Sequence, residues 1–123
     1  MKTILIVEDH KDFRREVRHF LEVSHIDVRL VEAASAEEGI VAAKANRPEI
    51  VLMDFWLGGM NGMDAAAQIK ETLPSCSIIM LTMFDIKEIG QLNGKHHVKE
   101  FISKGNLFEQ LIPSVKKILN SVN

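Results

Sequence analysis

Acidic, hydroxyl and cationic side chains directly follow four apolar runs of this 123-residue sequence. The runs are followed in turn by the pair Glu8-Asp9, by Asp54, by Thr82 and, after one serine, by Lys104. Neighbouring carboxylates repel one another unless a cation is present, and clustered oxygen ligands suit Mg²⁺. A carboxylate oxygen can accept a phosphoryl group when a cation, a lysine and a hydroxyl neutralise the charge. If the fold brings them together, these residue types indicate Mg²⁺-assisted formation of an aspartyl phosphate.

Each of these residues also has an ordinary explanation when it is taken singly. A carboxylate just after a strand commonly caps the next helix or lies in a solvated loop, and this applies to Asp54 and to Glu8-Asp9. Thr82 can be a cap or fill a strand position, and Lys104 can be solvated. The chemical interpretation therefore depends on their joint placement at the ends of four strands.

The elements that must position these side chains can be read from apolar periodicity. Continuous apolar runs predict strands, and apolar residues three and four apart predict helices. The strands are expected over 4–7, 28–30, 50–53, 77–81 and 101–102. The helices are expected over 13–21, 35–46, from 62 to before Pro74, over 86–92 with only partial periodicity, and from about 106 to 119. The pattern Ser35-Ala36-Glu37-Glu38 predicts a capping box, and Pro113 should kink the last helix or remove one hydrogen bond.

Five strand–helix units in one chain of this length predict a single doubly wound α/β domain, with a parallel sheet between two layers of helices. In such sheets the ligands bind at the carboxyl ends of the strands, where the polar residues above are expected. The net charge of −2 and the pI near 6.2 give no basic excess, so direct binding to nucleic acid is not expected. The lone Cys76 excludes an internal disulfide, and the N-terminal apolar run is too short for a signal peptide or a membrane span. We expect a soluble cytoplasmic protein.

Four stretches resemble the receiver domain of two-component response regulators, the CheY-like family. They are ILIVEDH, LMDFWLGGMNGMD, IIMLT and FISK, and the spacings between their polar residues match as well. The resemblance covers the whole chain, so residues 1–123 are expected to form one receiver domain. It implies a flavodoxin-like (βα)5 fold with strand order 2-1-3-4-5.

The resemblance also implies roles at the acidic positions. Asp54 corresponds to the phosphoacceptor, which takes a phosphoryl group from a histidine kinase or a phosphotransfer protein. Asp9 would bind Mg²⁺ directly and Glu8 largely through water, and Asp54 and the backbone carbonyl of Trp56 would be further ligands.

The remaining site positions correspond to the residues that respond to the phosphoryl group. Lys104 would pair with Asp54 and then with phosphoryl oxygens, and Thr82 would donate a hydrogen bond to the phosphoryl group. Phe101 matches the switch aromatic, although a core aromatic on a short strand explains it equally well. The change would reach the face formed by the fourth helix, the fifth strand and the fifth helix.

Two aromatics near the expected phosphoryl group suggest a kinetic hypothesis. Trp56 lies two residues after Asp54, and Phe84 lies two residues after Thr82. Bulky apolar side chains at these positions should hinder an attacking water, which would slow self-dephosphorylation. Alternatively, both rings pack away from the site and have no kinetic effect.

Several residues depart from the family pattern. Asn61 stands where a proline is usual before Gly62; asparagine tolerates unusual backbone angles, so the turn should survive. His97-Val98 replaces a small pair before the fifth strand, and the neighbouring His96 is assigned no role. The FISKG ending and the GGMNGMDA loop lean towards receivers coupled to LuxR-type helix-turn-helix domains.

The leading interpretation is a phosphorylation-controlled switch that regulates transcription through an attached DNA-binding domain. It is not an enzyme beyond self-phosphorylation and slow self-dephosphorylation, it has no membrane partner, and the family pattern admits a homodimer on phosphorylation. A stand-alone receiver acting by protein contact is the alternative. An aspartate-nucleophile phosphatase would need an Asp-x-Asp pair that VEDH lacks, and a flavin module would need a phosphate cradle that EDHKDF lacks. A phosphorylation-independent interaction domain would not need the complete acidic set and Lys104.

Overall fold

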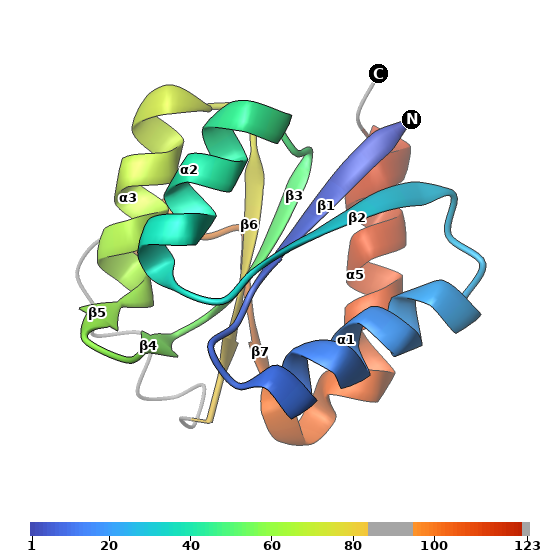
Figure 1. Ribbon diagram of the computed structural model, residues 1–123. Helices are drawn as coiled ribbons and strands as arrows, with labels where there is room; N and C mark the ends of the chain where they lie inside the picture. The colour runs from blue at the N-terminus through green and yellow to red at the C-terminus, as the bar shows by residue number, and fades with distance from the viewer. Residues whose placement is uncertain (84–94, 122–123) are drawn as a thin grey trace.

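A five-stranded parallel sheet forms the middle layer of the computed structural model, which describes residues 1–83 and 95–121. The strand order β2-β1-β3-β6-β7 corresponds to the expected order 2-1-3-4-5 (Figure 1). The strands are β1 (Lys2–Val7), β2 (Val28–Ala33), β3 (Ile50–Asp54), β6 (Ser77–Thr82) and β7 (Glu100–Ser103), with a small pair β4 (Trp56–Leu57) and β5 (Met60–Asn61). The helices are α1 (Lys11–Val23), α2 (Ala36–Asn46), α3 (Gly62–Thr72), η1 (Lys95–His97), η2 (Lys104–Asn106) and α5 (Leu107–Ser121).

Two hydrophobic layers hold the sheet, one on each face. Successive strand residues point to opposite faces, so Leu5 and Val7 join the core beneath α2 and α3, while Ile4 and Ile6 join the core beneath α1 and α5. Figure 1 shows the two helix pairs on opposite sides of the strands. All five residues of β3 are buried, as expected for a central parallel strand. The predicted doubly wound architecture is therefore confirmed.

The helix boundaries follow local signals in the sequence. The Ser35 hydroxyl accepts a hydrogen bond from the Glu38 backbone N–H at 3.1 Å, as the capping box predicts, but the Glu38 carboxylate accepts from the Ala34 N–H rather than from Ser35. Arg47 ends α2 in a left-handed conformation. Helix α5 continues through Pro113, which has no N–H to donate to the preceding turn. The helix expected over 86–92 lies outside the described residues.

The loop after β3 contains a feature that the sequence interpretation missed. Trp56 and Leu57 pair antiparallel with Asn61 and Met60, forming a two-stranded ribbon. Its turn uses Gly58 at φ +60°, whereas Asn61 has ordinary extended angles of φ −72° and ψ 130°. The tolerance of unusual angles expected of Asn61 is therefore not what preserves the turn.

Asn61 instead acts as the cap of α3. Its side-chain oxygen accepts a hydrogen bond from the Met63 N–H at 2.7 Å. The next residue, Gly62, packs so closely that a Cβ there would overlap the backbone carbonyl oxygens of Asp54 and Phe55. The start of α3 is thus pressed against the chain that carries Asp54.

Candidate functional site

The carboxyl edge of the sheet, at the bottom of Figure 1, brings the predicted polar residues together. Asp54 and Thr82 are the last residues of β3 and β6, Glu8-Asp9 follows β1, and Lys104 follows β7. These five residues line one cavity of about 330 Å³ together with His10, Phe55, Trp56 and Met83. Parallel pairing places these strand ends side by side, so the convergence follows from topology.

Three carboxylates form a compact acidic cluster at this edge. Glu8, Asp9 and Asp54 each offer an oxygen, and these oxygens lie within 4.8 Å of one another. Glu8 is 2% exposed and Asp54 is 8% exposed, whereas Asp9 is open to solvent. The cluster therefore has two buried members held by strand ends and one accessible member at the mouth.

The Lys104 ammonium bridges the two buried carboxylates. Its Nζ lies 3.2 Å from Oε1 of Glu8 and 3.1 Å from Oδ1 of Asp54. Burial by itself lowers the pKa of Lys104, but the hydrogen bonds and charges of Asp54 and then Glu8 outweigh it, so the pKa is raised. Lys104 is therefore a cation at neutral pH, fixed beside the Asp54 carboxylate.

Burial favours the neutral form of Glu8, as it does that of Lys104, but at Glu8 the opposing interactions do not outweigh it. It raises the pKa of this carboxyl from 4.5 to about 7, against the hydrogen bond from the His10 N–H; the charge of Asp54 adds to the rise and that of Lys104 opposes it. Glu8 is therefore partly protonated near neutral pH despite the Lys104 ammonium beside it.

The donor set fits a hard divalent cation. Carboxylate oxygens at this spacing, with one partner exposed to water, match the oxygen ligands and retained waters that Mg²⁺ prefers. The pKa of Glu8 is raised because its charged form is unfavourable when buried near Asp54. A bound divalent cation would stabilise that charged form. Trp56, whose carbonyl was expected as a further ligand, lines the same cavity.

Of the other predicted residues that the structure describes, Thr82 and Trp56 line the cavity and Phe101 does not. Thr82 is fully buried, and Trp56 is 63% exposed. Phe101 is half-buried and packs against the core beneath α2 and α3. Phe84 lies outside the described residues. His96 and His97, whose rings are tilted by 43° with 4.0 Å between their centroids, line a different hollow.

Two residues of α1 contact the site and were not singled out in the sequence. The Phe13 ring lies below the Lys104 ammonium, with 4.4 Å between Nζ and the ring centroid. Arg14 donates to the Glu8 carbonyl oxygen at 2.7 Å and to a Glu32 carboxylate oxygen at 3.0 Å. The sequence did contain one indication that both residues lie near the site. A helix that begins just after Glu8-Asp9 must start at the same edge of the sheet.

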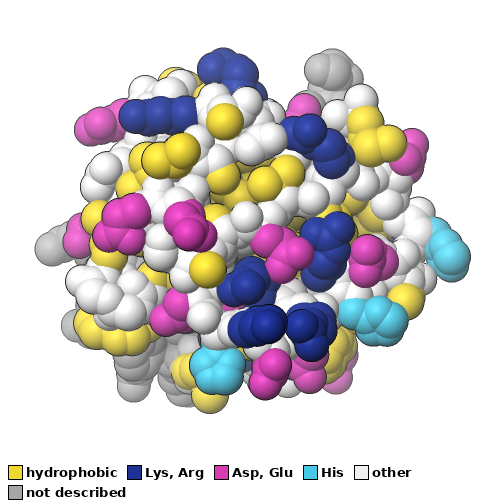
Figure 2. Space-filling view, viewed as in Figure 1, with side chains coloured by type: hydrophobic (Ala, Val, Ile, Leu, Met, Phe, Trp, Pro, Cys, Tyr) yellow, Lys and Arg dark blue, Asp and Glu magenta, His cyan; other side chains and the backbone are white. Residues whose placement is uncertain are grey.

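Charges on the face over α1 and β2 are mixed in sign. Figure 2 shows basic side chains crossing this face with acidic ones among them. Arg14 and Arg18 both pair with Glu32, at 3.0 and 2.8 Å, and Arg18 also lies 3.5 Å from Glu22. Arg14 and Arg18 are thus paired with acidic side chains within the protein.

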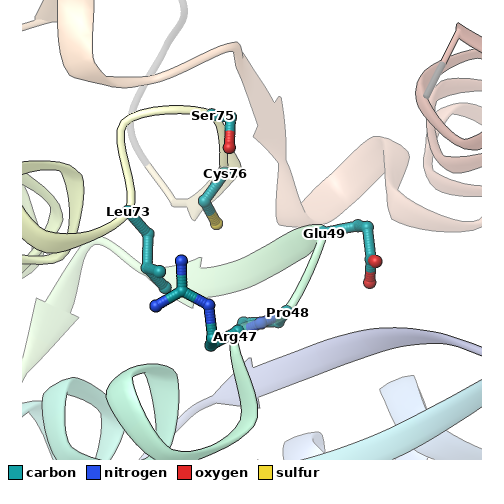
Figure 3. Close-up of a pocket in the computed structure, with 6 residues that line it drawn as sticks. All are labelled: Arg47, Pro48, Glu49, Leu73, Ser75 and Cys76. Carbon is teal, nitrogen blue, oxygen red and sulfur yellow. The ribbon is translucent and has the colours of Figure 1, made fainter. Parts of the chain in front are cut away.

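A second hollow, of about 300 Å³, lies at the opposite edge of the sheet. Arg47, Leu73 and Cys76 face it, while the Glu49 side chain points away (Figure 3). Glu49 instead accepts a hydrogen bond from the Thr3 N–H at 2.7 Å. Burial raises the pKa of the Cys76 thiol to about 11, so this sulfur is a poor nucleophile at neutral pH. The second hollow therefore lacks the chemistry of the first.

Comparison with known proteins decides the family. The family model of the response regulator receiver domain matches residues 4–116. The chain belongs to the response regulator receiver family. The resemblance inferred from the four sequence stretches is thereby confirmed, and the acidic edge described above is the edge of a receiver domain.

Individual receivers and regulators are similar over different lengths. Response regulator protein VraR of Staphylococcus aureus (strain NCTC 8325 / PS 47) is 37% identical over 82 residues, which cover 66% of this chain and only 39% of VraR. A LuxR-family two-component response regulator from Aurantimonas sp. SI85-9A1 is 26% identical, with a TM-score of 0.86 over 96% of this chain and 84% of that one. TrrA from Thermotoga maritima, solved in complex with Mg²⁺-BeF, is 24% identical, with a TM-score of 0.85 over 96% and 99% of the two chains, and so shares the fold.

Across the two described segments, no helix is long and apolar enough to cross a membrane.

Proposed function

We propose that this receiver domain is a phosphorylation-controlled switch in which Asp54 accepts a phosphoryl group. The observation that carries the proposal is the placement of Lys104, whose Nζ lies 3.1 Å from Oδ1 of Asp54 while the other acidic oxygens lie within 4.8 Å. A nucleophilic carboxylate, a fixed cation and a cation-binding cluster at one cavity are the parts that phosphoryl transfer requires.

In the proposed reaction, an Asp54 oxygen attacks the phosphorus of a phosphohistidine on a histidine kinase or phosphotransfer protein. The new O–P bond forms as the P–N bond breaks, and the histidine nitrogen leaves with the bonding electron pair. Lys104 and the Thr82 hydroxyl then neutralise and bind the phosphoryl oxygens. Glu8, Asp9, Asp54 and the Trp56 carbonyl would hold Mg²⁺, which supplies further charge neutralisation when bound.

The site can transmit the change through β6 and β7. Thr82 ends β6, and its register partner across the parallel ladder is Ser103, while Met80 pairs with Phe101. A shift of Thr82 towards the phosphoryl group would therefore act directly on β7. We propose that Phe101 follows this shift and alters the surface of β7 and α5. The helix expected over 86–92, which would share this face, falls outside the described residues.

Trp56 is proposed to slow loss of the phosphoryl group. Trp56 lines the cavity and is 63% exposed rather than packed into the core, which supports a side chain that limits the approach of water. The companion proposal for Phe84 concerns a residue outside the described segments. Trp56→Asn should shorten the lifetime of the phosphorylated protein, and an unchanged decay rate would contradict this role.

The output is proposed from the relatives. The LuxR-family neighbour supports a regulator that acts on DNA through an attached domain. The matched stretch spans 39% of VraR, which leaves room for a further domain in a regulator of that length. We propose that residues 1–123 form the receiver, that it acts in the cytoplasm, and that phosphorylation promotes a homodimer.

Beryllofluoride with Mg²⁺ tests the proposed switch, because it mimics a phosphoryl group on an aspartate. The chain has one tryptophan, and Trp56 lines the cavity, so its fluorescence reports binding there. We expect a saturable change in the wild-type protein and none in Asp54→Asn. A change that is equal in the two proteins would refute Asp54 as the acceptor, and rapid turnover of a small phosphate ester would indicate a phosphatase instead.

A further inference from the structure

A third contact of Lys104 has no place in the proposed function. Two sides of the ammonium face the carboxylates of Glu8 and Asp54, at 3.2 and 3.1 Å. A third side faces the ring of Phe13, with Nζ 4.4 Å from the ring centroid. The lysine side chain is 17% exposed, so these contacts form in a largely buried setting.

The geometry points to Phe13 as a positioning residue that holds the Lys104 ammonium towards Asp54 by a cation–π contact. This inference rests on the proposed function, because Lys104 is there the cation that meets the phosphoryl group. Phe13 touches neither the acceptor carboxylate nor the phosphoryl donor in this account, and it acts only through Lys104.

The physical reason lies in the freedom of the lysine side chain. A lysine carries a point charge on a flexible four-carbon stem, so two carboxylates alone leave it free to swing between them or outwards to solvent. The negative face of an aromatic ring attracts the ammonium within about 6 Å of its centroid. The ring also excludes water from one side, which strengthens the contacts with Glu8 and Asp54.

The alternative is that Phe13 merely fills space beneath α1. It does pack, half-buried, against the core between α1, α5 and the sheet. Phe20 provides a matched control on the same helix: it packs half-buried against the same core, and its described ring contact is with Phe108, at 4.8 Å between centroids. A purely structural role would make equivalent substitutions of Phe13 and Phe20 behave alike.

The first experiment measures access to the Lys104 amine in protein without metal or phosphoryl donor. Limited acylation is followed by peptide mass spectrometry, with the exposed Lys116 of α5 as internal reference. Phe13→Leu keeps apolar bulk but removes the ring face, so we expect Lys104 to react severalfold faster than in the wild type. Phe20→Leu should leave the ratio unchanged, and Phe13→Tyr, which restores the ring, should bring it back.

The second experiment measures the rate of phosphorylation by acetyl phosphate at saturating Mg²⁺. Phe13→Leu should lower the maximal rate constant about fivefold, equivalent to about 1 kcal/mol at 1.36 kcal/mol per tenfold. Phe13→Tyr should recover most of the rate, while Phe20→Leu should match the wild type. Thermal unfolding of all four proteins identifies any loss caused by unfolding.

The outcomes separate this inference from the function on which it rests. If the wild type accepts no phosphoryl group, the proposed function fails, whereas the acylation ratio still tests the contact. If the wild type is phosphorylated but Phe13→Leu and Phe20→Leu are indistinguishable in both experiments, the positioning role of Phe13 is overturned.

Discussion

Replacing Glu8 by glutamine should stabilise the metal-free protein at alkaline pH and not at acidic pH. Burial raises the pKa of Glu8 from 4.5 to about 7, so its charged form is disfavoured in the folded state. A raised folded pKa gives stability that is fully present below pH 4.5 and is lost as the pH rises through 7. At 1.36 kcal/mol per pKa unit, the loss above pH 7 is about 3 kcal/mol at most.

Glutamine keeps the shape of Glu8 without its charge, although it forfeits the ionic part of the contact with Lys104. We therefore expect Glu8→Gln to raise the free energy of unfolding by about 1–3 kcal/mol at pH 8, and to change it little at pH 4.5. Urea denaturation in the presence of EDTA at the two pH values measures the difference. Glu71→Gln, at an exposed position of α3, is the matched control and should show no comparable pH dependence.

The same unfolding measurement in the presence of Mg²⁺ tests whether a cation stabilises the charged Glu8. A ligand that binds only the folded protein at one hundred times its Kd stabilises it by about 2.7 kcal/mol. Wild-type protein at pH 8 should gain stability with Mg²⁺, and Glu8→Gln should gain less at the same concentration. If the stability difference between wild type and Glu8→Gln were the same at pH 4.5 and pH 8, the assignment of a buried, electrostatically costly Glu8 would be refuted.

Three further predictions concern the framework of the site and the second hollow. Gly62→Ala should lower the free energy of unfolding by about 1–3 kcal/mol in urea denaturation, because its Cβ would overlap the Asp54 carbonyl oxygen; Gly59→Ala, where a Cβ meets nothing within 4 Å, should be nearly neutral. Asn61→Ala should cost about 1 kcal/mol through loss of the α3 cap, and Asn61→Asp should retain most of it, so equal losses would contradict the cap. Cys76 should react with Ellman's reagent far more slowly in folded than in urea-unfolded protein at pH 8, because burial raises its pKa to about 11; the stability this provides is lost as the pH rises from 9 through 11. Rapid reaction of the folded protein would contradict the buried thiol.

The convergence of the acidic and basic residues could be predicted because it depends on topology alone. Strand ends of a parallel sheet lie along one edge, so apolar runs that end at Asp54 and Thr82 place these residues without knowledge of side-chain conformation. The same holds for Lys104, which follows β7 directly. The residues at the carboxyl ends of β1, β3, β6 and β7 were sufficient to locate the candidate site.

Contacts made by helix side chains could not be predicted in this way. Phe13 had the spacing of an ordinary core residue, and only the packing of α1 against the sheet places its ring beneath Lys104. Likewise, Arg14 bonds to the Glu8 carbonyl through a long side chain whose direction depends on Glu32. The cap made by Asn61 forms where the β4–β5 ribbon leads directly into α3, and this ribbon was not predicted from the sequence.

The most direct test of the account is to locate the phosphoryl group. The protein is incubated with acetyl phosphate, with and without Mg²⁺, and one added phosphoryl group is sought by intact mass spectrometry; borohydride reduction of the acyl phosphate then marks the acceptor residue in peptides. The account predicts a single Mg²⁺-dependent modification at Asp54 in the wild type and none in Asp54→Asn. Absence of the modification from the folded wild type with Mg²⁺, or equal modification of Asp54→Asn, would contradict it.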